Sequence, residues 1–233
     1  MEIRVYKNYQ ELSKAGAKEI FAYLEKKRKA VICVATGESP KGIYNLLTSR
    51  KELFSETVFL KLDEWGGIPP NDPSTCESYI KKFIITPLGL TDDRLLGFNT
   101  NPKKPDEECK RVLKLLDSLG GIDISILGLG SDGHIGLNFP AESIPESIHT
   151  VPGELLTHSM LQDAIHKPQY GFTLGFREIL MSSKIILPVS GSSKREALKK
   201  FLRGELTTQN PASILRLSQN LIVLCDEEAY GSN

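Results

Sequence analysis

Two adjacent acidic residues, Asp63 and Glu64, follow the short apolar segment 58–62. A carboxylate at the end of a buried strand can act as a general base, because burial raises its pKa towards neutrality. Adjacent residues of an extended segment point to opposite sides, so at most one of the two acids can face a given pocket. A loop cap or a surface ion pair is the competing interpretation of the same residues.

A glycine-rich segment, Gly128-Leu-Gly-Ser-Asp-Gly-His134, follows the apolar segment 123–127. Its spacing satisfies G-x-G-x-x-G, but a dinucleotide-binding turn needs a helix running on from the third glycine, and Asn138-Phe139-Pro140 interrupts any helix here. We therefore interpret the glycines as exposing Asp132 and His134 in a turn. The two side chains can hydrogen-bond, which would orient the imidazole as a proton shuttle, although a structural histidine is the alternative.

Two further turns could hold an anion. Thr36-Gly37-Glu38-Ser39-Pro40 offers hydroxyls and free amides at a helix start, and a simple helix cap is the alternative. Ser190-Gly-Ser-Ser-Lys194 offers amides, hydroxyls and an ammonium group. This second turn lacks the G-x-x-x-x-G-K-[ST] spacing of nucleoside triphosphatases, so a small sugar phosphate is the better-fitting ligand.

Strands and helices alternate along the chain, which predicts an α/β fold: a three-layer, mostly parallel sheet of about six to seven strands with helices on both faces, similar to a modified Rossmann fold. Strands are expected at 30–36, 58–62, 95–98, 123–127, 172–174, 184–189 and 221–225. Helices are expected over 9–29, after Pro40, and at 75–85, 106–119, 177–181, 193–202 and 212–215. We expect a single domain over 1–233, with a lid near residues 139–168, where no strand is evident.

The composition excludes several classes of protein. The 29 Lys and Arg balance the 29 Asp and Glu, so the basic surplus of a nucleic-acid or membrane-surface protein is absent. No apolar run has the length of a signal peptide or membrane span, and a cytoplasmic location is expected. The four cysteines are far apart, which favours neither a disulfide framework nor a metal site.

These motifs, in this order, resemble the glucosamine-6-phosphate deaminase and 6-phosphogluconolactonase superfamily. The resemblance extends from Val31 to Glu228 and is carried by A-T-G-E-S-P, L-D-E-W-G-G-I-P-P-N-D-P-S-T-C-E-S-Y, G-L-G-S-D-G-H-I-G-L-N-F-P, G-S-S-K and C-D-E-E-A. Trp65 and Thr75-Cys76-Glu77 look most like the galactosamine-6-phosphate deaminase/isomerase branch.

The resemblance implies a role for each matching residue. Asp63 would move the C2 proton of a 6-phosphohexosamine, His134 would assist ring opening with Asp132 orienting it, and Lys194 would bind the phosphate. The implied substrate-binding set is Thr36, Gly37, Ser39, Glu64, Gly130 and Lys194. No metal or other cofactor is implied, and the oligomeric state, including a homo-oligomer, is left open.

Two positions depart from the deaminase pattern. Phe139 stands where deaminases usually carry a glutamate, and N-F-P is closer to the lactonase pattern. Met160 stands roughly where glucosamine-specific members carry a phosphate-binding arginine.

The expected activity is conversion of a 6-phosphohexosamine to a 6-phosphoketose and ammonia. Galactosamine 6-phosphate is the favoured substrate and glucosamine 6-phosphate the next. The alternatives are a 6-phosphogluconolactonase and a non-catalytic sugar-phosphate sensor.

Overall fold

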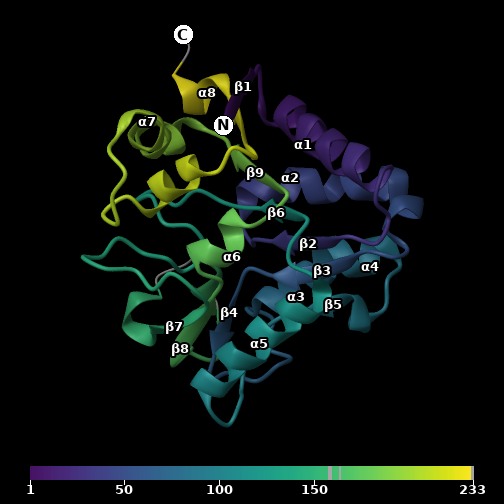
Figure 1. Cartoon of the computed structure of the whole chain (residues 1–233), viewed down its shortest axis with the longest axis vertical. Helices are drawn as coiled ribbons and strands as arrows, with labels where there is room; N and C mark the ends of the chain where they lie inside the picture. The colour runs from purple at the N-terminus through teal and green to yellow at the C-terminus, as the bar shows by residue number, and fades with distance from the viewer. Residues whose placement is uncertain (157–158, 163, 232–233) are drawn as a thin grey trace.

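The computed structural model describes residues 1–156, 159–162 and 164–231, and its largest element is a seven-stranded sheet (Figure 1). The strand order is β1-β10-β9-β6-β2-β3-β5, and every pairing in it is parallel. The strands are β1 (Glu2–Tyr6), β2 (Val31–Val34), β3 (Val58–Lys61), β5 (Leu95–Leu96), β6 (Ile124–Ile126), β9 (Lys184–Val189) and β10 (Leu221–Asp226).

Helices cover both faces of this sheet, which confirms the predicted three-layer α/β fold. They are α1 (Tyr9–Leu24), α2 (Glu38–Leu46), α3 (Cys76–Ile80), α4 (Thr86–Leu88), α5 (Pro105–Leu119), α6 (Phe176–Leu180), α7 (Arg195–Arg203) and α8 (Glu227–Tyr230). A π-helical turn continues α3 over Lys81–Ile85, and 3-10 turns occupy Leu47–Phe54, Ser192–Lys194 and Pro211–Leu217. No helix within the described residues is long and apolar enough to cross a membrane.

The central strands are apolar on both sides because each side meets a helical layer. In β2, Val31 and Cys33 join the core shared with α5, α6 and α7, while Ile32 and Val34 join the core shared with α1 and α2. Side chains of a strand alternate between its two faces, so a continuous apolar run is what two buried faces require.

A second, antiparallel sheet has the order β4-β8-β7 and lies to the lower left of the main sheet in Figure 1. It consists of β4 (Asp63–Gly66), β8 (Tyr170–Thr173) and β7 (His149–Pro152). The segment predicted as a strand at 172–174 belongs to this small sheet, and β1, β4 and β7 were not predicted. A short apolar strand looks the same in either sheet, since its partner is distant in sequence.

The parallel register brings four strand ends to one edge. Val34 of β2 pairs with Lys61 of β3 and with Ile126 of β6, which pairs in turn with Ile186 of β9. The turns that follow these four strands therefore start from the same edge. In open parallel sheets this is where ligands bind.

Candidate active site

A cavity of about 810 Å³ opens at this edge. Eight of the nine predicted site residues line it: Thr36, Gly37, Ser39, Asp63, Gly130, Asp132, His134 and Lys194. The predicted lid segment contributes Phe139, Pro140, Glu154, Leu155, Leu156 and Met160. Residues 157, 158 and 163 of that segment lie outside the described residues.

Three tyrosine hydroxyls hold the turn after β2. Tyr44 donates to the carbonyl of Ala35 at 2.7 Å, Tyr79 to that of Gly37 at 2.6 Å, and Tyr9 to that of Glu38 at 2.5 Å. Gly37 has φ +118°, a conformation that side-chain-bearing residues rarely adopt, and α2 begins directly after it. The first amides of α2 have no partner within the helix, so a fixed turn here presents donors suited to a phosphate.

Asp63, the first residue of β4, is only 7% exposed. Burial raises the pKa of its carboxyl group to about 7, and the nearby charge of Glu64 acts in the same direction. The Cys76 Sγ lies 3.7 Å from Asp63 Oδ1 and donates a hydrogen bond to it. A carboxyl group that titrates near neutrality can both take up and return a proton.

Glu64 points away from the cavity and does not line it, although a substrate contact was predicted. Its side chain is fully buried and accepts the backbone amides of Trp65, Cys76 and Glu77, each at 2.9 Å. The Lys61 ammonium lies 3.1 Å from it, in an equally buried ion pair. Glu64 thus ties the start of α3 to β4, and alternation along β4 sends Asp63 and Glu64 to opposite sides as expected.

His134 and Asp132 pair within their turn, as the sequence predicts. His134 Nδ1 lies 2.6 Å from Asp132 Oδ1, which also accepts the His134 amide at 3.1 Å. An ionised Asp132 selects the tautomer with the proton on Nδ1, leaving Nε2 to accept one. The ring lies over Gly130, where a Cβ would come within 2.3 Å of Nδ1. The Phe139 ring packs against the imidazole in an edge-type arrangement, with the ring centroids 5.0 Å apart.

Lys194 enters the cavity from the turn after β9. Asp226, at the end of β10, accepts the Ser190 hydroxyl and the Gly191 amide, and so holds that turn. Burial lowers the pKa of Lys194, while the charge of Asp132 opposes the shift. The charge of Asp132 offsets only part of the cost of burying the Lys194 ammonium group. An anionic ligand beside Lys194 would therefore be stabilised.

One hydrogen bond outside the predicted site ties down the segment that was predicted as a lid. His166 Nδ1 lies 2.7 Å from Asp72 Oδ2, and the other Asp72 oxygen accepts the amide and hydroxyl of Ser74. Burial alone would raise the pKa of Asp72, but the hydrogen bonds from Ser74 and His166 outweigh it and lower the pKa. Neither this bond nor the three tyrosines could be found from sequence, because their partners are far apart along the chain.

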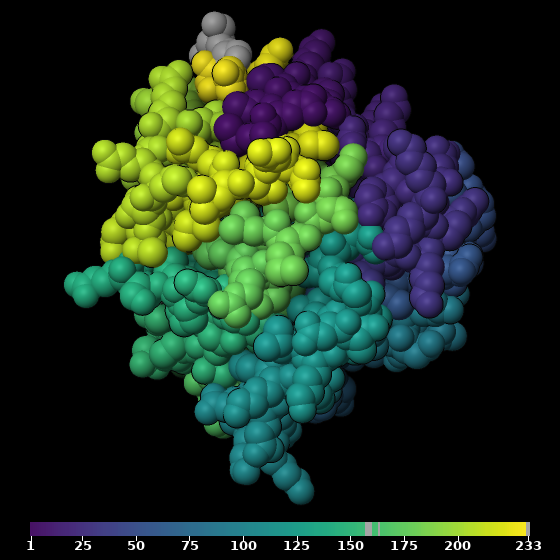
Figure 2. Space-filling model, in the orientation of Figure 1, coloured from purple at the N-terminus to yellow at the C-terminus, as the bar shows by residue number. Residues whose placement is uncertain are grey.

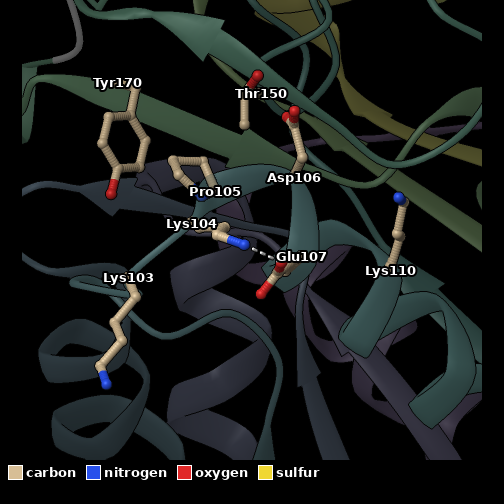
Figure 3. Close-up of a pocket in the computed structure, with 8 residues that line it drawn as sticks. All are labelled: Lys103, Lys104, Pro105, Asp106, Glu107, Lys110, Thr150 and Tyr170. Carbon is tan, nitrogen blue, oxygen red and sulfur yellow. Dashed lines mark hydrogen bonds and ion pairs between the residues drawn. The ribbon is translucent and has the colours of Figure 1, made fainter.

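A second cavity, of about 660 Å³, lies at the start of α5 (Figure 3). Three lysines and two acids line it together with Thr150 and Tyr170, and Lys104 pairs with Glu107 at 2.6 Å. None of the predicted site residues reaches this cavity. We therefore assign the candidate chemistry to the cavity at the strand ends.

An α/β sheet with an acid–base cavity at its carboxyl edge defines the class of protein, and sequence comparison then defines the family. Residues 7–224 match the family described as glucosamine-6-phosphate isomerases/6-phosphogluconolactonase, and the chain belongs to that family. This confirms the resemblance expected from the motifs.

Individual relatives agree with this membership. AgaI of Escherichia coli (strain K12), whose deaminase name is provisional, is 38% identical over 93% of this chain and 88% of its own length. A solved monomeric glucosamine-6-phosphate deaminase, described as a missing link of the NagB superfamily, matches with a TM-score of 0.92 at 32% identity, covering both chains fully. The 6-phosphogluconolactonase of Trypanosoma brucei matches with a TM-score of 0.73 at 21% identity over 99% of this chain and 97% of its own, a likeness of fold alone.

Proposed function

We propose that this chain is a hexosamine-6-phosphate deaminase/isomerase, which converts a 6-phosphohexosamine and water to a 6-phosphoketose and ammonia. The observation that carries the proposal is the buried Asp63 carboxyl group, with a pKa of about 7, in the cavity that also holds the His134–Asp132 pair. Relatives named as deaminases, at 32% identity or more, support this reaction over lactone hydrolysis.

The phosphate would bind first. Lys194 and the amides at the start of α2 would hold it at one end of the cavity, with Thr36 and Ser39 as further donors. Fixing the phosphate places the sugar carbons against the acid–base groups. Such orientation is a large part of catalysis when the reaction is a sequence of proton transfers.

Ring opening and isomerisation would follow in order. His134 takes the proton of the C1 hydroxyl and passes one to the ring oxygen, opening the hemiacetal. Asp63 then takes the C2 proton while the substrate's own ammonium group gives a proton to O1, so that an enolamine forms. Asp63 returns its proton at C1 to leave a protonated C2 imine. Water adds to the imine and ammonia departs, so the atoms balance without any oxidant or reductant.

Galactosamine 6-phosphate is the substrate we favour. Trp65 and the Thr75-Cys76-Glu77 segment resemble the galactosamine-6-phosphate branch, and Met160 stands where glucosamine-specific members carry an arginine. Phe139 against the His134 ring is the one observation that favours a 6-phosphogluconolactonase instead, with His134 activating water.

The four cysteines are unpaired, which supports a reducing compartment, and we place the enzyme in the cytoplasm.

One panel of assays tests the proposal. Ammonia release is measured from galactosamine 6-phosphate and glucosamine 6-phosphate, and acid release from 6-phosphogluconolactone. We expect ammonia from both amino sugars, faster from galactosamine 6-phosphate. Acid release alone would establish the lactonase, and binding of all three sugars without turnover would establish a sensor.

A further inference from the structure

Cys76 touches the candidate base and has no part in the reaction above. It is the first residue of α3, fully buried in a small apolar cluster with Trp65, Ile68, Leu137 and Val151. Its Sγ lies 3.7 Å from Asp63 Oδ1, within range of a thiol hydrogen bond. In the described part of the chain, no other residue's side chain donates to the Asp63 carboxylate.

Cys76 cannot move independently of the two acids. Its backbone amide donates to Glu64 Oε1 at 2.9 Å while its thiol donates to Asp63. Thr75 caps α3 by accepting the Ser78 amide at 3.0 Å, so the first turn of the helix is held at both ends. The consecutive acids therefore engage one residue, Glu64 through the main chain and Asp63 through the side chain.

The thiol stays protonated while the carboxyl group titrates. Burial raises the pKa of the Cys76 thiol well above its ordinary value, and the charges of Glu64 and Asp63 add to this, against smaller opposing effects of the Lys61 charge and the Thr36 hydrogen bond. A neutral S–H is therefore present on both sides of pH 7. It stabilises the ionised carboxylate without transferring its proton.

We propose that Cys76 is a positioning residue for Asp63: its S–H donates to Oδ1 and fixes the carboxylate in the orientation from which it exchanges protons with the substrate. The apolar packing of Cys76 alone does not require a thiol, because alanine would also fit such a cluster. The catalytic part of the inference rests on the proposed function, whereas the thiol–carboxylate bond does not.

The first test compares the variants Cys76→Ala and Cys76→Ser with Cys109→Ala, which removes a thiol on α5 outside the cavity lining. Loss of the donor should move the acidic limb of the kcat profile for galactosamine 6-phosphate up by roughly half a pH unit to one unit. At pH 6 this is an approximately three- to tenfold loss in kcat with little change in KM. Cys76→Ser should restore the wild-type limb, since a hydroxyl also donates, and Cys109→Ala should leave it in place.

The second test needs no turnover. Infrared titration follows the carboxyl band that disappears near pH 7, assigned to Asp63 by its absence in Asp63→Asn. It also follows the S–H band that is lost in Cys76→Ala. We expect the S–H band to shift as the carboxyl band titrates, and the carboxyl midpoint to rise in Cys76→Ala.

The outcomes separate the two proposals. An S–H band that does not respond to pH, or a carboxyl midpoint unchanged in a folded Cys76→Ala variant, would overturn the positioning role whatever the enzyme's substrate. A responsive band in a protein that releases no ammonia would uphold the contact and defeat the deaminase. Should Cys76→Ala fail to fold, Cys76→Ser, which also lacks the S–H group, assigns the band, and the S–H response of the wild-type protein then decides.

Discussion

At the scale of the single residue, the buried Asp63 carboxyl group sets the pH dependence expected of the reaction. In the proposed reaction only its ionised form can take the C2 proton, and burial raises its pKa to about 7. Activity should therefore rise with pH through about 7 and level off above it. Burial of a charged carboxylate also costs free energy, so the folded protein is less stable when Asp63 is ionised.

Replacing Asp63 by asparagine removes the proposed base and leaves the proposed phosphate contacts in place. We expect kcat for ammonia release to fall about 100- to 10,000-fold, the usual range for a positioned base. The affinity for a 6-phosphosugar, measured by calorimetry, should change little. Retained turnover in this variant would contradict the assignment of Asp63.

The same substitution should stabilise the fold. The pKa of Asp63 is raised above its unfolded value, so its contribution to stability is greatest below pH 4 and is lost as pH rises through about 7. At pH 8, Asp63→Asn should melt several degrees above wild type, and the difference should vanish near pH 4. A melting difference that is the same at both pH values would show that ionisation of Asp63 is not its cause.

Glu64 illustrates what residue types alone could and could not predict. Alternation indicates that one acid of the pair faces the pocket, but it does not indicate which one, or what the other does. The contacts of Glu64 are backbone amides and a buried lysine, and these depend on how α3 returns to β4. That return is a tertiary feature with no local signal in the sequence.

At the scale of elements, the turn after β6 can hold the His134 ring in its observed place only if residue 130 has no side chain. Gly128 and Gly130 differ in this respect, because a Cβ at Gly128 would meet only the Thr36 carbonyl oxygen at 4.0 Å, whereas one at Gly130 would overlap the His134 ring. The pair therefore provides a matched test of ring placement.

We expect Gly130→Ala to displace the His134 ring and lower kcat about 100-fold, within the range of a misplaced acid–base group. Gly128→Ala should retain nearly full activity, and both variants should melt close to wild type because the turn lies at the surface of the cavity. Kinetics and thermal melts of the two variants provide the check. Equal losses in both would show that the turn's flexibility matters and the ring clash does not.

All strands of the main sheet except β1 could be predicted, because they are apolar runs bounded by helix and turn signals. β4 could not, since Asp-Glu-Trp-Gly is a poor strand sequence, and it is extended only because Asp63 pairs with Thr173 of β8. β7 could not be distinguished from the rest of the predicted lid, because it too is extended only through its pairing with β8. Edge strand β1 is largely exposed and lacks the apolar run of a central strand.

At the scale of the whole molecule, zero net charge means that little attraction reaches an anionic substrate from a distance. Capture of the phosphate should then depend on a few groups that lie within the cavity. Lys194 is the one lysine among the described residues that line the cavity.

We expect Lys194→Met to weaken binding of 6-phosphosugars about 10- to 100-fold, the effect of one lost charged hydrogen bond. Lys103→Met changes the net charge equally but lies at the second cavity, and it should leave affinity and the salt dependence of kcat/KM as they are. Titration calorimetry measures the affinity of both variants, and steady-state kinetics at two salt concentrations measures the salt dependence of their kcat/KM. Similar losses in the two variants would point to long-range attraction in place of a local anchor.

The pairing of β1 with β10 bears on how the site is assembled. β10 lies between β9 and β1, so the two ends of the described chain are neighbours, visible as purple next to yellow in Figure 2. The same strand ends in Asp226, which holds the turn that presents Lys194. During synthesis β1 must therefore wait for β10 to be made, and the turn that carries Lys194, the proposed phosphate anchor, becomes rigid only once β10 has formed.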